Sequence, residues 1–253
     1  MNQKPELIVA LDVDTLEKAK DFITKLYPAV KYFKIGSQLF TAYGPEAIKM
    51  AGEKGAKVFL DLKFHDIPQT VFSGVVSGTG LSYEPVFIST KPSNIGQEIK
   101  NATIYPVFMM SVHTGGVDRK MLEEAVRGAK EKATELNIEP PLIVGVTVLT
   151  SDANSQDTLA TVIERAKFAK DAGLDGVVCS VSEAAEVRSE CGKDFIIVTP
   201  GIRPKGTANN DQKRIATPTE AMKAGANFMV VGRPILEASD PLKAVKEILC
   251  QKN

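Results

Sequence analysis

The sequence predicts a single-domain (β/α)₈ barrel, a TIM barrel, over residues 1–253. Short apolar, β-branched runs recur eight times along the chain, and helix-like segments lie between most of them. The runs are almost continuously apolar, as is typical of parallel strands buried on both faces. Eight such units favour a closed barrel over an open doubly wound sheet. No G-x-G-x-x-G follows the first run, which weakens the dinucleotide-binding alternative.

The elements follow one another in strict alternation. The expected strands are Leu7–Leu11, Tyr32–Ile35, Lys57–Leu60, Val107–Val112, Leu142–Val146, Gly176–Cys179, Phe195–Val198 and Phe228–Val231. The clearest expected helices are Thr15–Leu26, Met121–Leu136, Gln156–Ala172, Thr217–Ala224 and Pro241–Leu249. A weak repeat precedes three of the strands, in which an alanine is followed four residues later by Gly55, Gly173 or Gly225. Each glycine fits the left-handed position that ends a helix.

Composition excludes several classes of protein. The 253 residues are 43% hydrophobic and 25% charged, enough for one sizeable core. Because 31 basic residues balance 31 acidic ones, no overall field would attract nucleic acid or an anionic membrane. Three cysteines without a C-x-x-C pair suit a reducing cytoplasm and make structural zinc unexpected. The apolar run Leu7–Leu11 is too short for a signal peptide or a membrane span, so we expect a soluble cytoplasmic protein.

The segment Asp61–Thr70 carries the strongest chemical signal, because it follows an expected buried strand. Residues two apart in a strand point to the same side, so Asp61 and Lys63 would project together, with Asp66 arriving from the loop beyond. A solvated loop with an exposed ion pair is the simpler interpretation of such a pattern taken alone. Its position at the end of a buried strand favours a functional site.

Polar residues also lie at the ends of the other expected strands. They are Asp12, Lys34, His113, Thr147–Thr150, Ser180, Pro200 and Gly232–Arg233. Asp12 and Ser180 could instead cap helices, and a histidine such as His113 is more often structural than catalytic. Because the active sites of (β/α)₈ barrels lie where the strands end, the set together predicts a polar pocket.

The end of the last expected strand predicts a phosphate site. Barrels often bind phosphate there with backbone N–H groups, and the Arg233 guanidinium beside Gly232 could hold two phosphate oxygens. The preceding segment, Thr199–Arg214, is long, basic and rich in Gly and Pro, which is typical of a lid that orders over an anion. A surface arginine before a proline turn, with a plain connector, is the alternative.

Together these segments resemble the orotidine 5′-monophosphate decarboxylases, which make uridine monophosphate in pyrimidine biosynthesis. The matching segments are Ala10–Asp12, Phe33–Gly36, Asp61–Pro68, Val146–Ser151, Val198–Pro204 with Asp211–Gln212, and Val231–Pro234. The resemblance implies cofactor-independent and metal-independent decarboxylation of orotidine 5′-monophosphate. In it Lys63 would protonate carbon 6, within a Lys-Asp-Lys-Asp network of Lys34, Asp61, Lys63 and Asp66.

The resemblance also implies roles for the surrounding residues. Asp61 would lie against the departing carboxylate, while Lys34 and Asp12 would hold the charge network and the ribose hydroxyls. The implied substrate-binding residues are Asp12, Ile67, Thr70, Thr150, Pro200, Arg203, Gln212, Gly232 and Arg233. Thr150 would contact the pyrimidine amide edge, Gln212 and the Gly232–Arg233 pair the phosphate, and Pro200 with Arg203 belong to the lid region.

A homodimer is the implied working form, because Asp66, Ile67 and Thr70 would reach into the neighbouring subunit's site. Two departures from the family pattern stand out. The chain is longer than bacterial relatives between Thr70 and His113, and the surplus is expected as a surface insertion around Ser73–Asn94. One residue fewer than usual separates His113 from the two following glycines, so His113 is given no catalytic role.

Two other functions compete with this interpretation. A metal-dependent sugar-phosphate decarboxylase or aldolase would use acidic groups to hold Mg²⁺ against an enediolate. The presence of only two histidines, and of no acidic cluster beyond Asp61 and Asp66, argues against it. The other competitor is a catalytically inactive, nucleotide-binding barrel that serves as a sensor or scaffold. The presence of Lys34, Lys63, Asp61 and Asp66, which the resemblance implies are needed for catalysis, argues against such an inactive protein.

Overall fold

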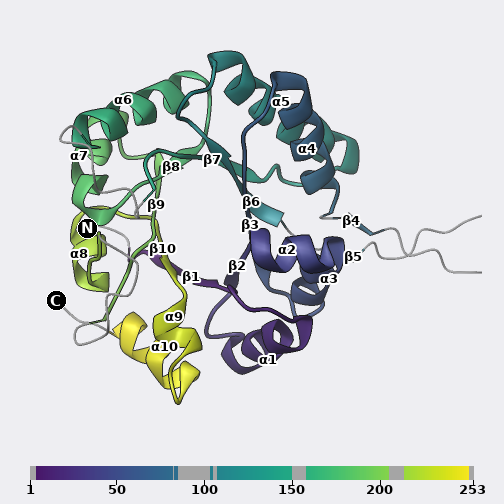
Figure 1. Cartoon of the computed structure of the whole chain (residues 1–253), viewed down its shortest axis with the longest axis vertical. Helices are drawn as coiled ribbons and strands as arrows, with labels where there is room; N and C mark the ends of the chain where they lie inside the picture. The colour runs from purple at the N-terminus through teal and green to yellow at the C-terminus, as the bar shows by residue number, and fades with distance from the viewer. Residues whose placement is uncertain are drawn as a thin grey trace, which may run out of the picture.

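The computed structural model describes residues 4–81, 83–84, 103–104, 107–149, 158–204 and 214–250. Eight parallel strands close into a barrel in the order β1-β10-β9-β8-β7-β6-β3-β2, which confirms the predicted fold class. Viewed end-on, the strands form a ring and the helices surround it (Figure 1). The barrel strands are β1 (Glu6–Ala10), β2 (Tyr32–Gly36), β3 (Lys57–Phe64), β6 (Val107–His113), β7 (Leu142–Val146), β8 (Gly176–Val178), β9 (Ile196–Thr199) and β10 (Phe228–Val231). All eight expected strands are present.

The helices alternate with these strands. Those that match expected segments are α1 (Leu16–Leu26), α5 (Arg119–Leu136), α6 (Thr158–Asp171), α8 (Pro218–Lys223) and α10 (Pro241–Cys250). Helices also form where none was named from the sequence: α2 (Ser37–Tyr43), α3 (Pro45–Gly52), α4 (Pro68–Gly80), α7 (Val181–Cys191) and α9 (Arg233–Leu236). The expected helix-ending glycines are confirmed, since Gly55, Gly173 and Gly225 have φ of 77°, 86° and 81°.

The insertion begins later than the sequence suggested. Ser73–Gly80 continue α4 and are not a surface excursion, because the glycines of this helix allow close packing on the barrel. A Cβ at Gly78 would lie 2.6 Å from Met110 Sδ, and one at Gly74 would lie 3.1 Å from the Phe64 ring. Beyond α4, the short strands β4 (Tyr83–Glu84) and β5 (Thr103–Ile104) pair antiparallel outside the barrel (Figure 1). The rest of the expected insertion lies outside the described residues.

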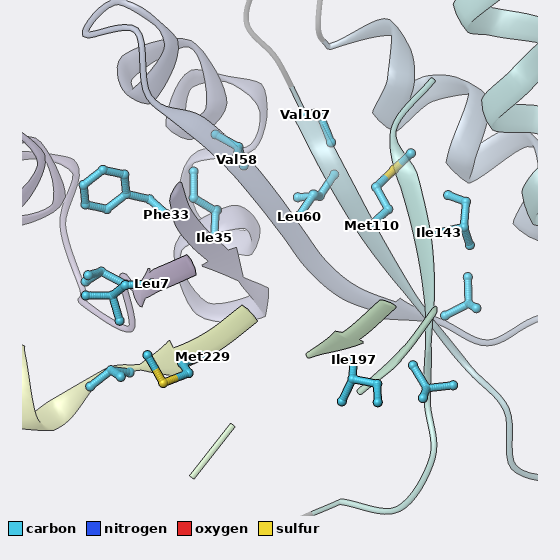
Figure 2. Packing of buried hydrophobic residues seen from close by; sticks show 14 of the residues in the cluster. Leu7, Phe33, Ile35, Val58, Leu60, Val107, Met110, Ile143, Ile197 and Met229 are labelled. Carbon is cyan, nitrogen blue, oxygen red and sulfur yellow. The ribbon is translucent and has the colours of Figure 1, made fainter. Parts of the chain in front are cut away.

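Alternate strand residues supply two separate cores. Outward-facing side chains such as Leu7, Val58 and Leu60 join the large cluster between strands and helices (Figure 2). Inward-facing side chains such as Ile8 and Phe59 fill the barrel itself. This alternation explains why the strands are apolar at nearly every position.

Three aromatic rings close the barrel at the end where the strands begin. Tyr32 lies 4.7 Å from Phe108 and 5.6 Å from Phe228, measured between ring centroids. Because this end is filled, the space left inside the barrel opens at the carboxyl ends of the strands. Among the side chains predicted from the sequence to be chemically active, Lys34, Lys63 and His113 lie near those ends, and Asp12 lies just beyond one of them.

Candidate active site

A chain of alternating charges crosses the carboxyl ends of β1, β2 and β3. Lys63 Nζ lies 2.9 Å from Asp61 Oδ2, and the same oxygen lies 3.4 Å from Lys34 Nζ. Lys34 Nζ in turn donates to Asp12 Oδ1 at 3.0 Å. Four of the predicted site residues are therefore brought together. Asp12 and Asp61 are 49 positions apart in the sequence, but they lie close in space because β1, β2 and β3 are neighbours in the barrel.

The charged side chains of this network keep one another ionised. Burial on its own would lower the pKa of Lys34, but the charges of Asp61 and Asp12 outweigh it, and the net pKa is raised. Burial would likewise raise the pKa of Asp61, yet Lys34 and Lys63, with a hydrogen bond from Ser111, lower it. Near neutral pH Lys34 is thus a cation and Asp61, 7% exposed, an anion.

Ser111 is a site residue that sequence reasoning missed. Its hydroxyl donates to Asp61 Oδ1 at 2.8 Å and accepts the Lys63 backbone N–H at 2.9 Å. Lys63 has a φ of 53°, a left-handed conformation that costs a non-glycine residue roughly 1–2 kcal/mol. Such strain at a residue with the right chemistry is a mark of functional sites. In the sequence, Ser111 was hidden inside the apolar strand β6.

A cavity of about 160 Å³ lies against the charge network. Its lining joins three charged side chains to a mostly apolar surface: Lys34, Phe59, Asp61, Lys63, Val146, Val148, Leu149, Val178, Cys179, Pro200 and Val230. Mostly apolar walls with a few convergent charges are typical of a site for a small organic ligand. Pro200, predicted to bind substrate, is part of this lining.

Of the predicted phosphate residues, Gly232 lies beside the network. A Cβ at Gly232 would lie 3.8 Å from Asp12 Oδ2 and 3.5 Å from Ala10 Cβ, so the backbone after β10 passes close to the end of β1. Arg233 begins the short helix α9 and is partly exposed. A cationic side chain and a glycine backbone next to the charged network suit an anionic group of a bound ligand.

The segment after β9 is pinned at its two described ends. The Arg203 N–H donates to the Ala216 carbonyl at 2.8 Å, and Ala216 N–H donates to the Gly201 carbonyl at 3.2 Å. Arg203 is buried, and its guanidinium donates to the Ile202 carbonyl at 2.9 Å. Of the other predicted binding residues, Thr150 and Gln212 lie outside the described part of the chain.

Asp66, Ile67 and Thr70 stand apart from the network of their own chain. All three are exposed, and Ile67 retains 66% exposure although it is a large apolar residue. Asp66 Oδ1 accepts the Ile67 N–H at 2.6 Å, and the ion pairs found among the described residues do not include Asp66. These residues begin α4 at the rim of the barrel, where they are accessible to another molecule.

His113 lies near the network without joining it. Its ring centroid is 5.4 Å from that of His65, and the pKa of His113 is lowered, first by burial and then by the positive charges of His65 and Lys63. No group of three His, Cys, Asp or Glu side chains within the described ranges is arranged to hold a metal ion. Of the helices found there, none has the length and apolar character needed to cross a membrane.

Comparison with known proteins identifies the family of this chain. The chain matches the orotidine 5′-phosphate decarboxylase / HUMPS family over residues 5–80 and 102–248, and residues 81–101 lie between the two matched stretches. Orotidine 5′-phosphate decarboxylase of Moorella thermoacetica is 38% identical, covering 99% of this chain and 93% of its own. That of Coxiella burnetii is 40% identical, covering 96% and 95%. The crystal structure of orotidine 5′-phosphate decarboxylase from Lactobacillus acidophilus matches with a TM-score of 0.76 at 33% identity, covering 98% of both chains.

Proposed function

The chain belongs to the orotidine 5′-phosphate decarboxylase / HUMPS family, and on this premise we propose that it is a carboxy-lyase that converts orotidine 5′-monophosphate to uridine 5′-monophosphate and CO₂ in pyrimidine biosynthesis. The observation that carries the proposal is the alternating chain Lys63–Asp61–Lys34–Asp12 along a cavity of the right character. Losing CO₂ from an sp² ring carbon leaves a carbanion that needs a positive charge and a proton. Lys63 offers both.

In the proposed mechanism Lys63 donates a proton to carbon 6 as the carbon–carboxylate bond breaks. Asp61 holds the Lys63 ammonium at 2.9 Å and is itself kept ionised by the two lysines. Asp61 also lies against the departing carboxylate, so loss of CO₂ relieves a like-charge repulsion. The electrons of the broken bond stay on carbon 6 and form the new C–H bond with the proton from Lys63.

One lysine is too weak to explain the reaction alone. Two unit charges about 4 Å apart interact by roughly 4 kcal/mol at an effective dielectric constant of about 20. Enzymes lower activation barriers by about 8–23 kcal/mol. The remainder comes from the preorganised charge array and from binding energy at the distant phosphate, used to hold the ring against Lys63.

The proposal also gives roles to the other predicted residues. Asp12, which is half-exposed and bonded to Lys34, takes the ribose hydroxyls. Gly232, which lies next to Asp12, and Arg233, which follows it, take the phosphate together with Gln212, while Thr150 contacts the pyrimidine. Pro200 lines the cavity beside the reacting ring, and Arg203 fixes the base of the following segment.

A homodimer completes the proposed site. Asp66 and Thr70 are exposed, and the exposed Ile67 beside them is an apolar contact residue for a second copy. Asp66 of the partner would then supply the last carboxylate of the Lys-Asp-Lys-Asp network. A cytoplasmic location is consistent with the cysteines, which are all free.

The function is tested by mixing EDTA-treated protein with orotidine 5′-monophosphate and following the loss of its ultraviolet absorbance. Turnover in EDTA is expected, because the proposed chemistry uses the charges of protein side chains and no metal ion. Absence of turnover, with activity towards a sugar phosphate on addition of Mg²⁺, would favour the metal-dependent class instead.

A further inference from the structure

The turn that follows β7, Thr147–Leu149, has its three consecutive carbonyls held by two arginines. Arg165 of α6 donates to the Thr147 carbonyl. Arg214 donates to the carbonyls of Val148 at 3.2 Å and Leu149 at 2.9 Å. Thr147 is also tied to β8, since its hydroxyl donates to the Val178 carbonyl at 2.8 Å. The turn is thus fixed by side chains that come from elsewhere in the fold.

The side chains of this turn form part of the cavity. Val148 and Leu149 line it together with Asp61 and Lys63. Leu149 is 44% exposed, so burial alone does not hold it in place. The hydrogen bonds from Arg214 to two successive carbonyls fix the backbone at this point, and with it the direction of both apolar side chains.

Arg214 is itself held by a buried carboxylate. Its guanidinium pairs with Glu183 of α7, and the side chains of Arg214 and Glu183 are 15% and 5% exposed. Glu183 also accepts hydrogen bonds from Ser180 and Ser182, so its position is set by three partners. Separating this buried ion pair would leave a buried charge uncompensated, which is costly. The pair therefore holds Arg214 firmly in place.

We propose that Arg165 and Arg214, with Glu183 as counter-charge, are positioning residues that hold Val148 and Leu149 as an apolar wall against the pyrimidine ring. The inference rests on the proposed function. Arg165, Arg214 and Glu183 are not among the residues that line the cavity. They act on a bound ligand only through the backbone of Thr147–Leu149. A flat ring gains more affinity from apolar walls that are already in place before it binds, because no conformational entropy is then lost in ordering them.

The matched control is Arg188 of α7, which also holds backbone carbonyls, but at the end of the barrel where the strands begin. Its guanidinium donates to the carbonyls of Gly192 and Gly225, which precede β9 and β10. Arg188→Met removes an arginine of the same chemistry far from the cavity. It is expected to lower the melting temperature without changing which ligands bind.

The test compares two ligands by calorimetry: uridine 5′-monophosphate, and ribose 5-phosphate, which lacks the base. Arg214→Met, and separately Arg165→Met, should weaken the nucleotide by roughly tenfold or more and leave ribose 5-phosphate within about twofold. Arg214→Lys keeps a positive charge beside Glu183 but lacks the several N–H donors of the guanidinium. Its affinity for the nucleotide should lie between those of the unmodified protein and Arg214→Met.

Equal losses for both ligands, or no loss in either variant, would overturn the inference while the proposed function stands. If the unmodified protein binds uridine 5′-monophosphate no more tightly than ribose 5-phosphate, the base is not recognised. That result would overturn the proposed function, and the apolar wall with it.

Discussion

The hydroxyl of Ser111 accepts the backbone N–H of Lys63 at 2.9 Å and so holds Lys63 in its left-handed conformation. The same hydroxyl donates to Asp61, which pairs with the Lys63 ammonium. One buried serine therefore fixes both the backbone and the counter-charge of the proposed proton donor. This link between β3 and β6 makes the position of Lys63 a property of the barrel rather than of a loop.

Ser111→Ala is expected to lower kcat by about tenfold or more, because Asp61 loses a hydrogen bond worth roughly 1.5–3 kcal/mol to a charged group. Steady-state kinetics with orotidine 5′-monophosphate checks this. Ser73→Ala is the control, since among the described residues that hydroxyl accepts a hydrogen bond from Gln69 on the exposed side of α4, away from the charge network. A Ser111→Ala enzyme with unchanged kcat would show that Lys63 is positioned without this bond.

The charge network also predicts how stability depends on pH. The pKa of Asp61 is lowered from 3.8, so its contribution is complete above that value and is lost as pH falls through the folded-state pKa. The pKa of Lys34 is raised from 10.5, so its contribution is complete below that value and is lost as pH rises further.

Urea unfolding at a series of pH values tests this dependence. In Asp61→Asn, the free energy of unfolding should fall less steeply below about pH 4 than in the unmodified protein. In Lys34→Met, the decline above about pH 10.5 should be shallower for the same reason. Parallel curves for variant and unmodified protein would contradict the ionisation states assigned to the network.

Arg233→Ala should weaken binding of uridine 5′-monophosphate by about 10- to 100-fold, since a charge-assisted pair of hydrogen bonds is lost. Binding of uridine, which has no phosphate, should stay unchanged in the same titration. Equal losses for both compounds would place Arg233 at the base or the ribose instead of the phosphate.

The proposed dimer predicts complementation between inactive subunits. Lys63→Ala and Asp66→Asn are each expected to abolish most activity. When the two are mixed and allowed to exchange subunits, half of the dimers are hybrids with one intact site, which restores about a quarter of normal activity. Failure of the mixture to recover would mean that Asp66 serves its own chain's site.

The strands of the fold were predictable because parallel strands buried on both faces leave a nearly continuous apolar record in the sequence. Helix α4 was not, since its glycines suggest a loop when the sequence is taken alone. They are required by contacts with Met110 and Phe64, which only the folded barrel brings within reach. The expected insertion around Ser73–Asn94 therefore included one end of a helix.

The site was predictable in part for a similar reason. Asp12 follows β1, and Lys34, Asp61 and Lys63 lie towards the carboxyl ends of β2 and β3, so the rule that barrel chemistry lies at strand ends is enough to collect them. Ser111 lies inside a strand, and Glu183 joins Arg214 across 31 positions of sequence. Their importance depends on pairings between elements that no local pattern encodes.

The central claim, that Lys63 donates the proton, is tested most directly by Lys63→Ala. Turnover of orotidine 5′-monophosphate by the EDTA-treated variant should be abolished, while calorimetry shows uridine 5′-monophosphate bound within about tenfold of the unmodified affinity. Retained binding with lost turnover would place Lys63 in the chemical step. Turnover at the unmodified rate would remove Lys63 from the mechanism and contradict the account.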